Sequence, residues 1–207
     1  MVRRGWVEAD EFSDLVVVRS PDEVKRLDVE KVFGNGNELE VDIGCGKGRF
    51  LIARASSYPQ TNFLGVERQA GRVLRTAKKA VRLGLENVRL ARVEACGGLA
   101  ELLEPGSVAT VYVFFPDPWP KRRHHRRRLI NSDFMDLMHE KLRVGGLLHF
   151  ASDHADYAKQ VSGVFAGDER FEADEVFEPT EEERTDFELI FRGQSKPIWR
   201  YTVRKLA

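Results

Sequence analysis

Cysteine is scarce in this sequence, and long apolar runs are missing. The 207 residues include two cysteines, Cys45 and Cys96, which are too few for a disulfide framework. Cys45 also lies between two glycines, where a disulfide would be awkward, so a reducing cytoplasm is the expected environment. No apolar stretch approaches the roughly 20 residues that span a bilayer, and the first six residues lack the apolar core of a signal peptide. We therefore expect a cytoplasmic protein with no membrane partner.

Net charge is absent as well, but the charges are unevenly distributed. The chain has 33 basic and 33 acidic residues. Residues 121–128 hold six permanent cations in eight positions, whereas residues 171–188 hold nine carboxylates and one arginine. Two such segments cancel in the sum but need not lie together in space, so the net charge of zero does not exclude a nucleic-acid partner.

Short apolar runs alternate with longer amphipathic ones after a turn signal at residues 34–37. Strands are predicted at residues 39–43, 62–67, 88–93, 108–115, 147–151, 171–177 and 198–205. Helices are predicted at residues 48–57, 69–83, 133–142 (with Ser132 as its N-cap) and 156–166. This alternation predicts an α/β fold, a doubly wound and mostly parallel seven-stranded sheet with helices on both faces. We expect one domain over residues 38–207, with residues 1–37 as an N-terminal extension of undetermined structure.

A glycine loop separates the first predicted strand from its helix. Gly44, Gly46 and Gly48 allow the backbone to approach a ligand or to adopt a positive φ, although a purely structural turn would also use them. The dinucleotide pattern G-x-G-x-x-G fails because Arg49 stands where the third glycine belongs, which disfavours a nicotinamide oxidoreductase. Asp42, directly before the loop, would repel a pyrophosphate. It suits a cationic ligand such as S-adenosylmethionine, which carries an ammonium and a sulfonium.

Two further carboxylates follow predicted strands. Glu67 could accept hydrogen bonds from both hydroxyls of a ribose, and Glu94 is placed to meet the edge of an adenine. Each could instead be a solvated surface carboxylate. Because ligands bind beyond the carboxyl ends of parallel strands, we expect Asp42, Glu67 and Glu94 to lie near one another.

The most distinctive segment follows the fourth predicted strand. Three prolines among residues 116–120 stiffen this segment, and they hold Asp117 between two of them. Trp119 could stack on a base or a cation, or could belong to the core. Cations clustered directly behind an acidic turn favour phosphate contacts over a merely solvated face. His124 and His125 lack ligand partners at suitable spacing, so no metal site is expected. The expected phosphate contacts are Arg122, Arg123, Arg126 and Arg127.

The run Pro-Asp-Pro-Trp-Pro-Lys-Arg-Arg-His-His-Arg-Arg-Arg-Leu at residues 116–129 resembles the signature of bacterial tRNA (guanine-N7)-methyltransferases. The glycine loop at 42–48 and the segments 65–67, 152–157 and 184–188 are similar to that family too, and the resemblance runs from about residue 39 to the C-terminus. It implies a Rossmann-like class I methyltransferase fold with an antiparallel strand near the C-terminus. It also implies methyl transfer from S-adenosylmethionine to N7 of a guanine in tRNA, in the variable loop.

The resemblance further implies two sets of contacts. Those with the cofactor involve the glycines together with Asp42, Glu67, Glu94 and Asp117, and Asp117 is also the catalytic residue. Those with the tRNA substrate involve Lys121, Asp153, Thr185, Asp186, Phe187 and Glu188. Asp153 could instead cap the helix that follows it. Most of the acidic stretch at 178–188 is expected to be solvated loop, with only Thr185 and Glu188 pointing inward.

Methylation of guanine N7 needs no general base, because this nitrogen has an in-plane lone pair and no proton. Catalysis should then depend on positioning and on electrostatics. Asp117 would orient the guanine by accepting hydrogen bonds from N1–H and N2–H₂. Two other functions stay open: a class I methyltransferase acting on a small molecule or protein, and a non-catalytic RNA-binding relative. The basic segment disfavours the first, and the intact glycine loop with Asp42 and Glu67 disfavours the second. The sequence leaves open whether the protein is a monomer or a homodimer.

Overall fold

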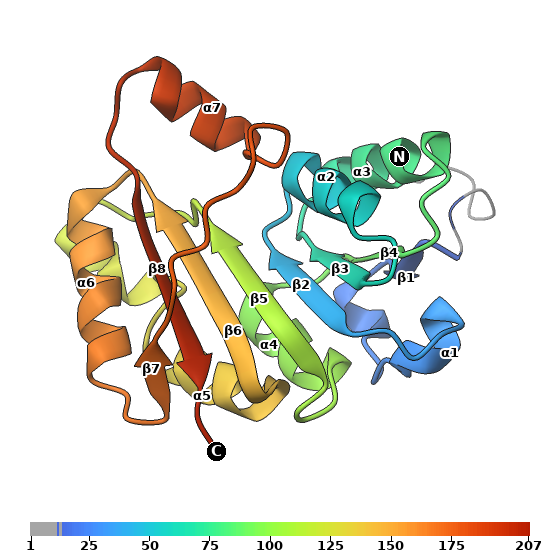
Figure 1. The fold of residues 1–207 in the computed structure, drawn as a ribbon, viewed down its shortest axis with the longest axis horizontal. Helices are drawn as coiled ribbons and strands as arrows, with labels where there is room; N and C mark the ends of the chain where they lie inside the picture. The colour runs from blue at the N-terminus through green and yellow to red at the C-terminus, as the bar shows by residue number, and fades with distance from the viewer. Residues whose placement is uncertain (1–11, 13) are drawn as a thin grey trace, which may run out of the picture.

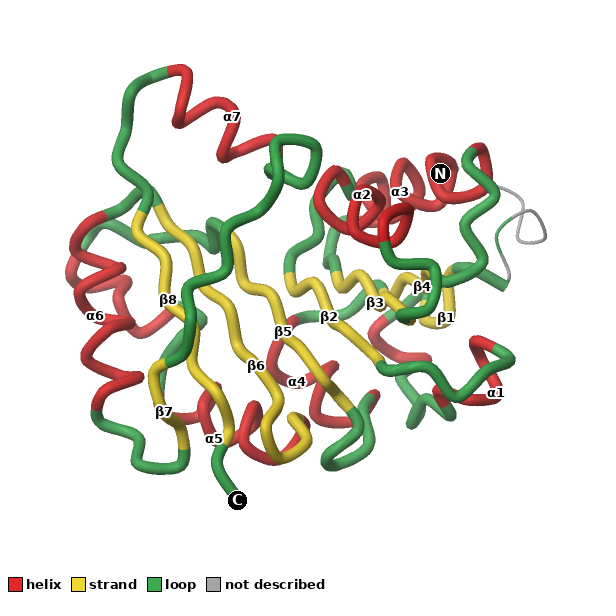
Figure 2. The backbone as a smooth tube through the Cα atoms, viewed as in Figure 1, coloured by secondary structure: helices red, strands yellow, loops and turns green. Residues whose placement is uncertain are grey.

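The computed structural model describes Phe12 and residues 14–207 and shows one mixed sheet with helices on both faces (Figures 1 and 2). The sheet has eight strands, in the order β1-β4-β3-β2-β5-β6-β8-β7. Their bounds are β1 Val16–Val18, β2 Leu39–Ile43, β3 Asn62–Val66, β4 Val88–Ala91, β5 Val108–Phe114, β6 Leu142–Ser152, β7 Phe171–Ala173 and β8 Trp199–Lys205. The predicted doubly wound sheet is therefore confirmed, with one strand more than expected.

The strands from β1 to β6 all pair in parallel, and β8 runs antiparallel between β6 and β7. The strand order reverses between the adjacent strands β2 and β5. Such a switch point leaves a crevice beyond the carboxyl ends of the strands, and ligands of this class of fold bind there. The additional strand, β1, is too short for its pattern to be recognised. It pairs with β4 and so belongs to the same sheet. The domain boundary after residue 37 stays a prediction.

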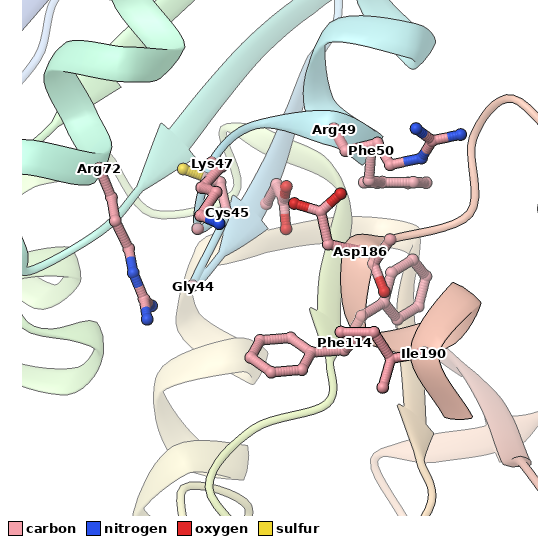
Figure 3. A pocket seen from close by; sticks show the side chains of 13 residues that line it. Gly44, Cys45, Lys47, Arg49, Phe50, Arg72, Phe114, Asp186 and Ile190 are labelled. Atoms are coloured by element: carbon pink, nitrogen blue, oxygen red, sulfur yellow. The ribbon is translucent and has the colours of Figure 1, made fainter. Parts of the chain in front are cut away.

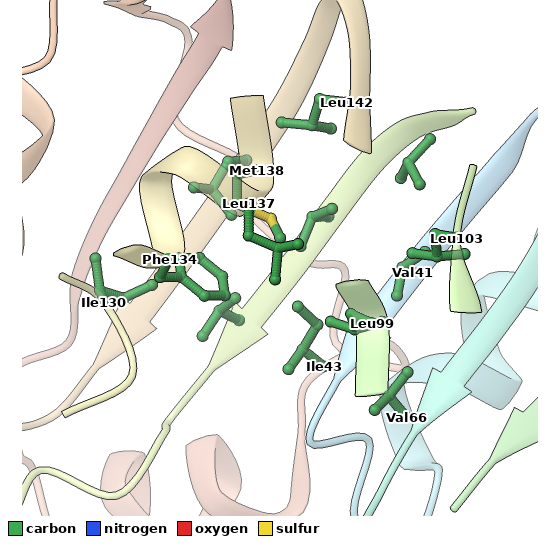
Figure 4. Packing of buried hydrophobic residues seen from close by; sticks show 14 of the residues in the cluster. Val41, Ile43, Val66, Leu99, Leu103, Ile130, Phe134, Leu137, Met138 and Leu142 are labelled. Carbon is green, nitrogen blue, oxygen red and sulfur yellow. The ribbon is translucent and has the colours of Figure 1, made fainter. Parts of the chain in front are cut away.

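Helices cover the two faces of the sheet in groups. Their bounds are α1 Val29–Phe33, α2 Arg49–Ser57, α3 Ala70–Arg82, α4 Ala95–Leu102, α5 Ser132–Lys141, α6 Ala155–Ala166 and α7 Asp186–Gly193, with short 3₁₀ helices η1 Pro21–Glu23 and η2 Arg122–Arg127. Buried apolar residues of α4, α5 and α6 form the main core on one face, whereas α2 and α3 pack together on the other. Figure 4 shows Leu99 of α4 near Ile43 of β2, and Met138 of α5 beside Leu137, all in the same core cluster. This core holds the strand ends rigidly beneath the crevice.

Some helix ends differ from the prediction. Helix α5 is capped by Asn131, whose Oδ1 accepts a hydrogen bond from the Phe134 N–H at 3.0 Å, so the predicted N-cap Ser132 is wrong. Asn and Ser are equally good caps, and the sequence did not distinguish them. The short helices α4 and α7 were not predicted. No helix in the described residues is long and apolar enough to cross a membrane.

Candidate active site

The glycine loop turns tightly over the end of β3. The amides of Gly44 and Cys45 both donate to the carbonyl of Val66, at 2.8 and 3.1 Å. Gly44 and Gly48 have φ angles of 79° and 73°, in the left-handed region that favours glycine. A Cβ at Gly48 would lie 2.3 Å from Cγ2 of Thr76 in α3. The loop therefore needs glycine both for its backbone shape and for its contact with α3.

A pocket opens between this loop and the start of α7 (Figure 3). Asp42, Gly44 and Gly46 line it from one side, and Thr185 to Phe187 line it from the other. The two sides are joined directly, because Arg49 Nε donates to the carbonyl of Arg184 at 2.8 Å across 135 residues of sequence. The fold thus brings part of the predicted cofactor set and part of the predicted substrate set into one pocket.

Asp42 is the most strongly perturbed acid of this pocket. Its side chain is buried, and burial raises its pKa to about 7, with a further contribution from the negative charge of Glu67. A buried carboxyl beside a second carboxylate is stabilised in its charged form by a cation. Asp42 therefore favours a positively charged group beside it, and its contact with the cofactor stays a prediction.

Glu67 and Glu94 lie in different environments. Glu67 is buried just beyond β3, where its Oε1 accepts from the Gln69 amide at 2.8 Å and its Oε2 from Arg72 Nη1 at 3.3 Å. Its carboxylate is thus fixed in orientation. Glu94 is exposed at the start of α4 and makes no capping hydrogen bond. Contacts of either residue with a nucleoside stay predictions.

The turn that carries Asp117 has a strained backbone. Phe115 and Trp119, on either side of the Pro-Asp-Pro sequence, have φ angles of 52° and 44°. This left-handed conformation costs roughly 1 kcal/mol or more for each non-glycine residue. Asp117 itself is exposed, and the pocket in Figure 3 does not include it in its lining. The guanidinium of Arg127 lies 4.9 Å from the centre of the Trp119 ring, so this ring stacks on a cation.

Arg128 supports this turn and is unlike the other cations of its run. Its side chain is 1% exposed. It donates to the carbonyl of Pro118 at 2.8 Å, to Gln160 Oε1 at 2.7 Å and to Asp156 Oδ2 at 2.6 Å. Arg128 therefore ties the strained turn to α6. The other five cations of the run are exposed: Lys121, Arg122, Arg123, Arg126 and Arg127.

Asp153 does not cap α6. That role belongs to His154, whose Nδ1 accepts from the Tyr157 amide at 3.3 Å, so the capping alternative is wrong. Asp153 instead pairs with Lys196, with Oδ2 and Nζ 3.0 Å apart. Its predicted contact with a substrate stays a prediction.

The acidic stretch is more ordered than its composition indicates. Thr185 caps α7, because its Oγ1 accepts from the Glu188 amide at 3.0 Å. The carboxylate of Glu188 is 1% exposed, and its Oε1 lies 2.6 Å from Arg200 Nη2. Glu183 is also buried and pairs with Arg54 of α2 at 3.2 Å, a contact that no sequence pattern predicts. The expectation that only Thr185 and Glu188 point inward was therefore incomplete.

Comparison with known proteins identifies the family. A family model described as "Putative methyltransferase" matches residues 37–201. A tRNA (guanine-N(7)-)-methyltransferase of Nitrosococcus oceani is 35% identical over 174 residues, which cover 84% of this chain and 74% of that protein. The chain belongs to this methyltransferase family.

Relatives of the same name occur in Halorhodospira halophila, with 42% identity over 70% of this chain, and in Thermotoga maritima, with 37% identity over 87%. The chain spans 63% and 58% of the length of these two relatives. Among solved structures, a 30S ribosomal A1408 methyltransferase from an uncultured bacterium superposes with a TM-score of 0.60 at 14% identity, over 91% of this chain and 99% of that chain. This likeness confirms the Rossmann-like methyltransferase fold of the family.

Proposed function

We propose that the protein transfers the methyl group of S-adenosylmethionine to N7 of a guanine in the variable loop of tRNA. The observation that carries this proposal is the pocket that joins the glycine loop and buried Asp42 to the start of α7. Membership of a family whose relatives are named as tRNA (guanine-N(7)-)-methyltransferases supports it.

The residues at the glycine loop fit this cofactor. Asp42 would balance the positive charge of the bound methionine portion, and the glycines allow close approach of the backbone. Glu67, already oriented by Arg72 and the Gln69 amide, would accept hydrogen bonds from the ribose, and Glu94 would meet the adenine. When bound, S-adenosylmethionine supplies an electrophilic methyl group on its sulfonium.

The protein's own contribution to the transfer is positioning and electrostatics. Asp117 would accept hydrogen bonds from N1–H and N2–H₂ of the guanine, fixing N7 in line with the methyl group and stabilising the purine as it becomes cationic. Thr185 to Phe187 would contact the nucleoside from the other side of the pocket, with Glu188 holding α7 in place behind them. Lys121 and Asp153 would contact the tRNA close to the turn.

The exposed cations of η2 supply the contacts that a small substrate would not need. Arg122, Arg123, Arg126 and Arg127 stand on one short helix whose base is anchored by buried Arg128. Cations fixed in this way suit the phosphates of an RNA backbone. This arrangement favours tRNA over a metabolite or a protein as the methyl acceptor.

Incubation with tritiated S-adenosylmethionine and either bulk tRNA or a pool of metabolites and proteins tests the proposal. We expect label in the tRNA, and mass mapping of nuclease fragments should place N7-methylguanosine in the variable loop. A methyl group at another position, or label in the metabolite pool alone, would contradict the assignment. Calorimetric titration with S-adenosylhomocysteine separates an active enzyme from an RNA-binding relative that has lost its cofactor.

A further inference from the structure

Helix α3 presents charge of one sign beside the pocket. Residues 68–85 contain six cations and no acidic residue, although the whole chain has no net charge. We call them the α3 cations: Arg68, just before the helix, and Arg72, Arg75, Lys78, Lys79 and Arg82 within it. The opposite side of the helix, with Val73, Ala77 and Ala80, is buried in the core, so packing already accounts for the apolar half of the helix and leaves the charged half unexplained.

Most of the α3 cations have no partner of opposite charge among the residues that the structure describes. Four of them are exposed and form no ion pair with any residue that the structure describes: Arg68, Arg75, Lys78 and Arg82. Arg72 pairs with Glu67, and Lys79 Nζ donates to the carbonyl of Lys47 in the glycine loop at 2.8 Å. Over Phe12 and residues 14–207, the positive charge on this face is therefore largely uncompensated.

Part of this arrangement is unfavourable for the helix by itself, although Lys79 and Arg82 in the last turn suit the helix dipole. Arg75 with Lys79, and Lys78 with Arg82, are like-charge pairs four residues apart, and such pairs destabilise a helix. Arg72 lies in the first turn, where the helix dipole disfavours a cation. A partner rich in negative charge would remove both penalties, whereas an ordinary solvated face would mix the two signs.

The α3 cations begin at the pocket and lead away from it. Arg72 and Lys47 both line the pocket, and Figure 3 shows Arg72 on the side away from Asp186 and Ile190 of α7. Arg72, Arg75, Lys79 and Arg82 follow one another at spacings of three and four residues, which places them along one side of the helix over about 15 Å. A polyanion whose reacting base lies in the pocket could follow this stripe outward.

We propose that the α3 cations form a second contact surface for the phosphate backbone of the RNA substrate, separate from η2. Helix η2 is tied to α6 through Arg128, and Figure 1 shows α6 and α3 at opposite sides of the molecule. The two basic surfaces thus flank the pocket and contact the folded body of a large RNA from both sides. This inference rests on the proposed function, because it takes tRNA as the substrate.

Salt dependence of tRNA binding tests this surface. Each phosphate contact adds about one unit to the slope of log Kd against log salt. The variant Arg75→Gln/Lys78→Gln should bind tRNA more weakly at physiological salt and lower that slope by about two units. Binding is measured by fluorescence anisotropy with S-adenosylhomocysteine present. The variant should keep its affinity for S-adenosylhomocysteine and its methylation rate at saturating tRNA, because neither residue lines the pocket.

The matched control removes two exposed lysines elsewhere. Lys25→Gln/Lys31→Gln, at and just before α1, makes the same change in net charge and should leave the slope as in wild type. Arg126→Gln/Arg127→Gln should lower the slope through η2. If the η2 variant lowers the slope and the α3 variant does not, the proposed α3 surface is wrong while the proposed function stands.

Two other results would also contradict the proposal of an α3 contact surface. A wild-type protein that neither binds nor methylates tRNA would remove the proposed function and this inference together. If the α3 variant bound tRNA normally but lost binding to vesicles containing phosphatidylserine, the surface would belong to a membrane.

Discussion

At the scale of single residues, Asp42 has the clearest electrostatic consequence. Its pKa is about 7 in the folded protein against an ordinary value of 3.8. The folded state therefore binds this proton more tightly than the unfolded state, and the contribution of Asp42 to stability falls as pH rises from about 4 to about 7. Above pH 7 the ionised, buried carboxylate lowers the free energy of unfolding by its full amount, on the order of 4 kcal/mol, unless a cationic ligand is bound.

Asp42→Asn should remove this dependence. Without ligand, we expect the variant to be more stable than wild type at pH 8, by up to about 4 kcal/mol, and similar to it at pH 4. Urea unfolding at the two pH values measures the difference. The variant should also bind S-adenosylmethionine more weakly. Glu101→Gln, at an exposed acid of α4, is the control and should behave like wild type. Equal pH dependence in wild type and Asp42→Asn would contradict the role of this carboxyl.

Arg128 provides a second prediction at this scale. Arg128→Lys keeps the charge, but the single nitrogen of lysine cannot replace the planar fork whose Nε, Nη1 and Nη2 reach Pro118, Gln160 and Asp156. The strained turn should then shift, and we expect kcat to fall about tenfold or more, since small displacements of a positioning group have large kinetic effects. The salt dependence of tRNA binding should stay close to that of wild type, because Arg128 is itself buried and the exposed cations of η2 keep their charges.

Steady-state kinetics at low and high salt distinguish these two effects. Arg126→Lys is the control, since its side chain is exposed and makes no such bonds within the described residues. An Arg128→Lys enzyme with wild-type kcat would show that the turn holds its shape without this anchor.

At the scale of elements, α7 is where the sequence was least informative. Phe187, Leu189 and Ile190 are exposed, so the helix has no buried apolar stripe from which to predict it. Helix α4 was missed for a different reason, because Gly97 and Gly98 lower helix propensity. By contrast, β2, β3 and β5 were predicted almost to the residue. β3 and β5 are mostly apolar, as buried parallel strands are, and β2 alternates apolar residues with Glu40 and Asp42.

Thr185 controls the start of α7, and its replacement gives the prediction at this scale. Thr185→Ala removes the hydrogen bond to the Glu188 amide and should cost about 1 kcal/mol. We expect faster amide hydrogen exchange in the first turn of α7, together with a raised KM for tRNA, because that turn lines the pocket. Thr185→Ser keeps the capping oxygen and should restore both properties. Exchange unchanged in Thr185→Ala would mean that the ion pairs of Glu188 hold the helix by themselves.

At the scale of the whole molecule, the sequence could predict the residues of the site more readily than the buried charged residues that hold them in place. Asp42 and the glycines were recognisable because their chemistry is local to one loop. The pairing of Glu183 with Arg54 depends on a contact across 129 residues, and the buried state of Arg128 depends on α6. Neither charge differs from its exposed neighbours in the sequence. Their roles can be recognised only from their distances to partner residues in the folded protein.

The position of β8 has a consequence for the order in which the molecule is made. β8 is the last described strand in the chain, yet it lies between β6 and β7. During synthesis on the ribosome, β7 therefore leaves the exit tunnel before the strand that joins it to the sheet. The pocket wall from α7 is likewise synthesised after the glycine loop that it faces. A nascent chain can form the parallel half of the sheet first, but it can enclose its substrate only after α7 has also emerged.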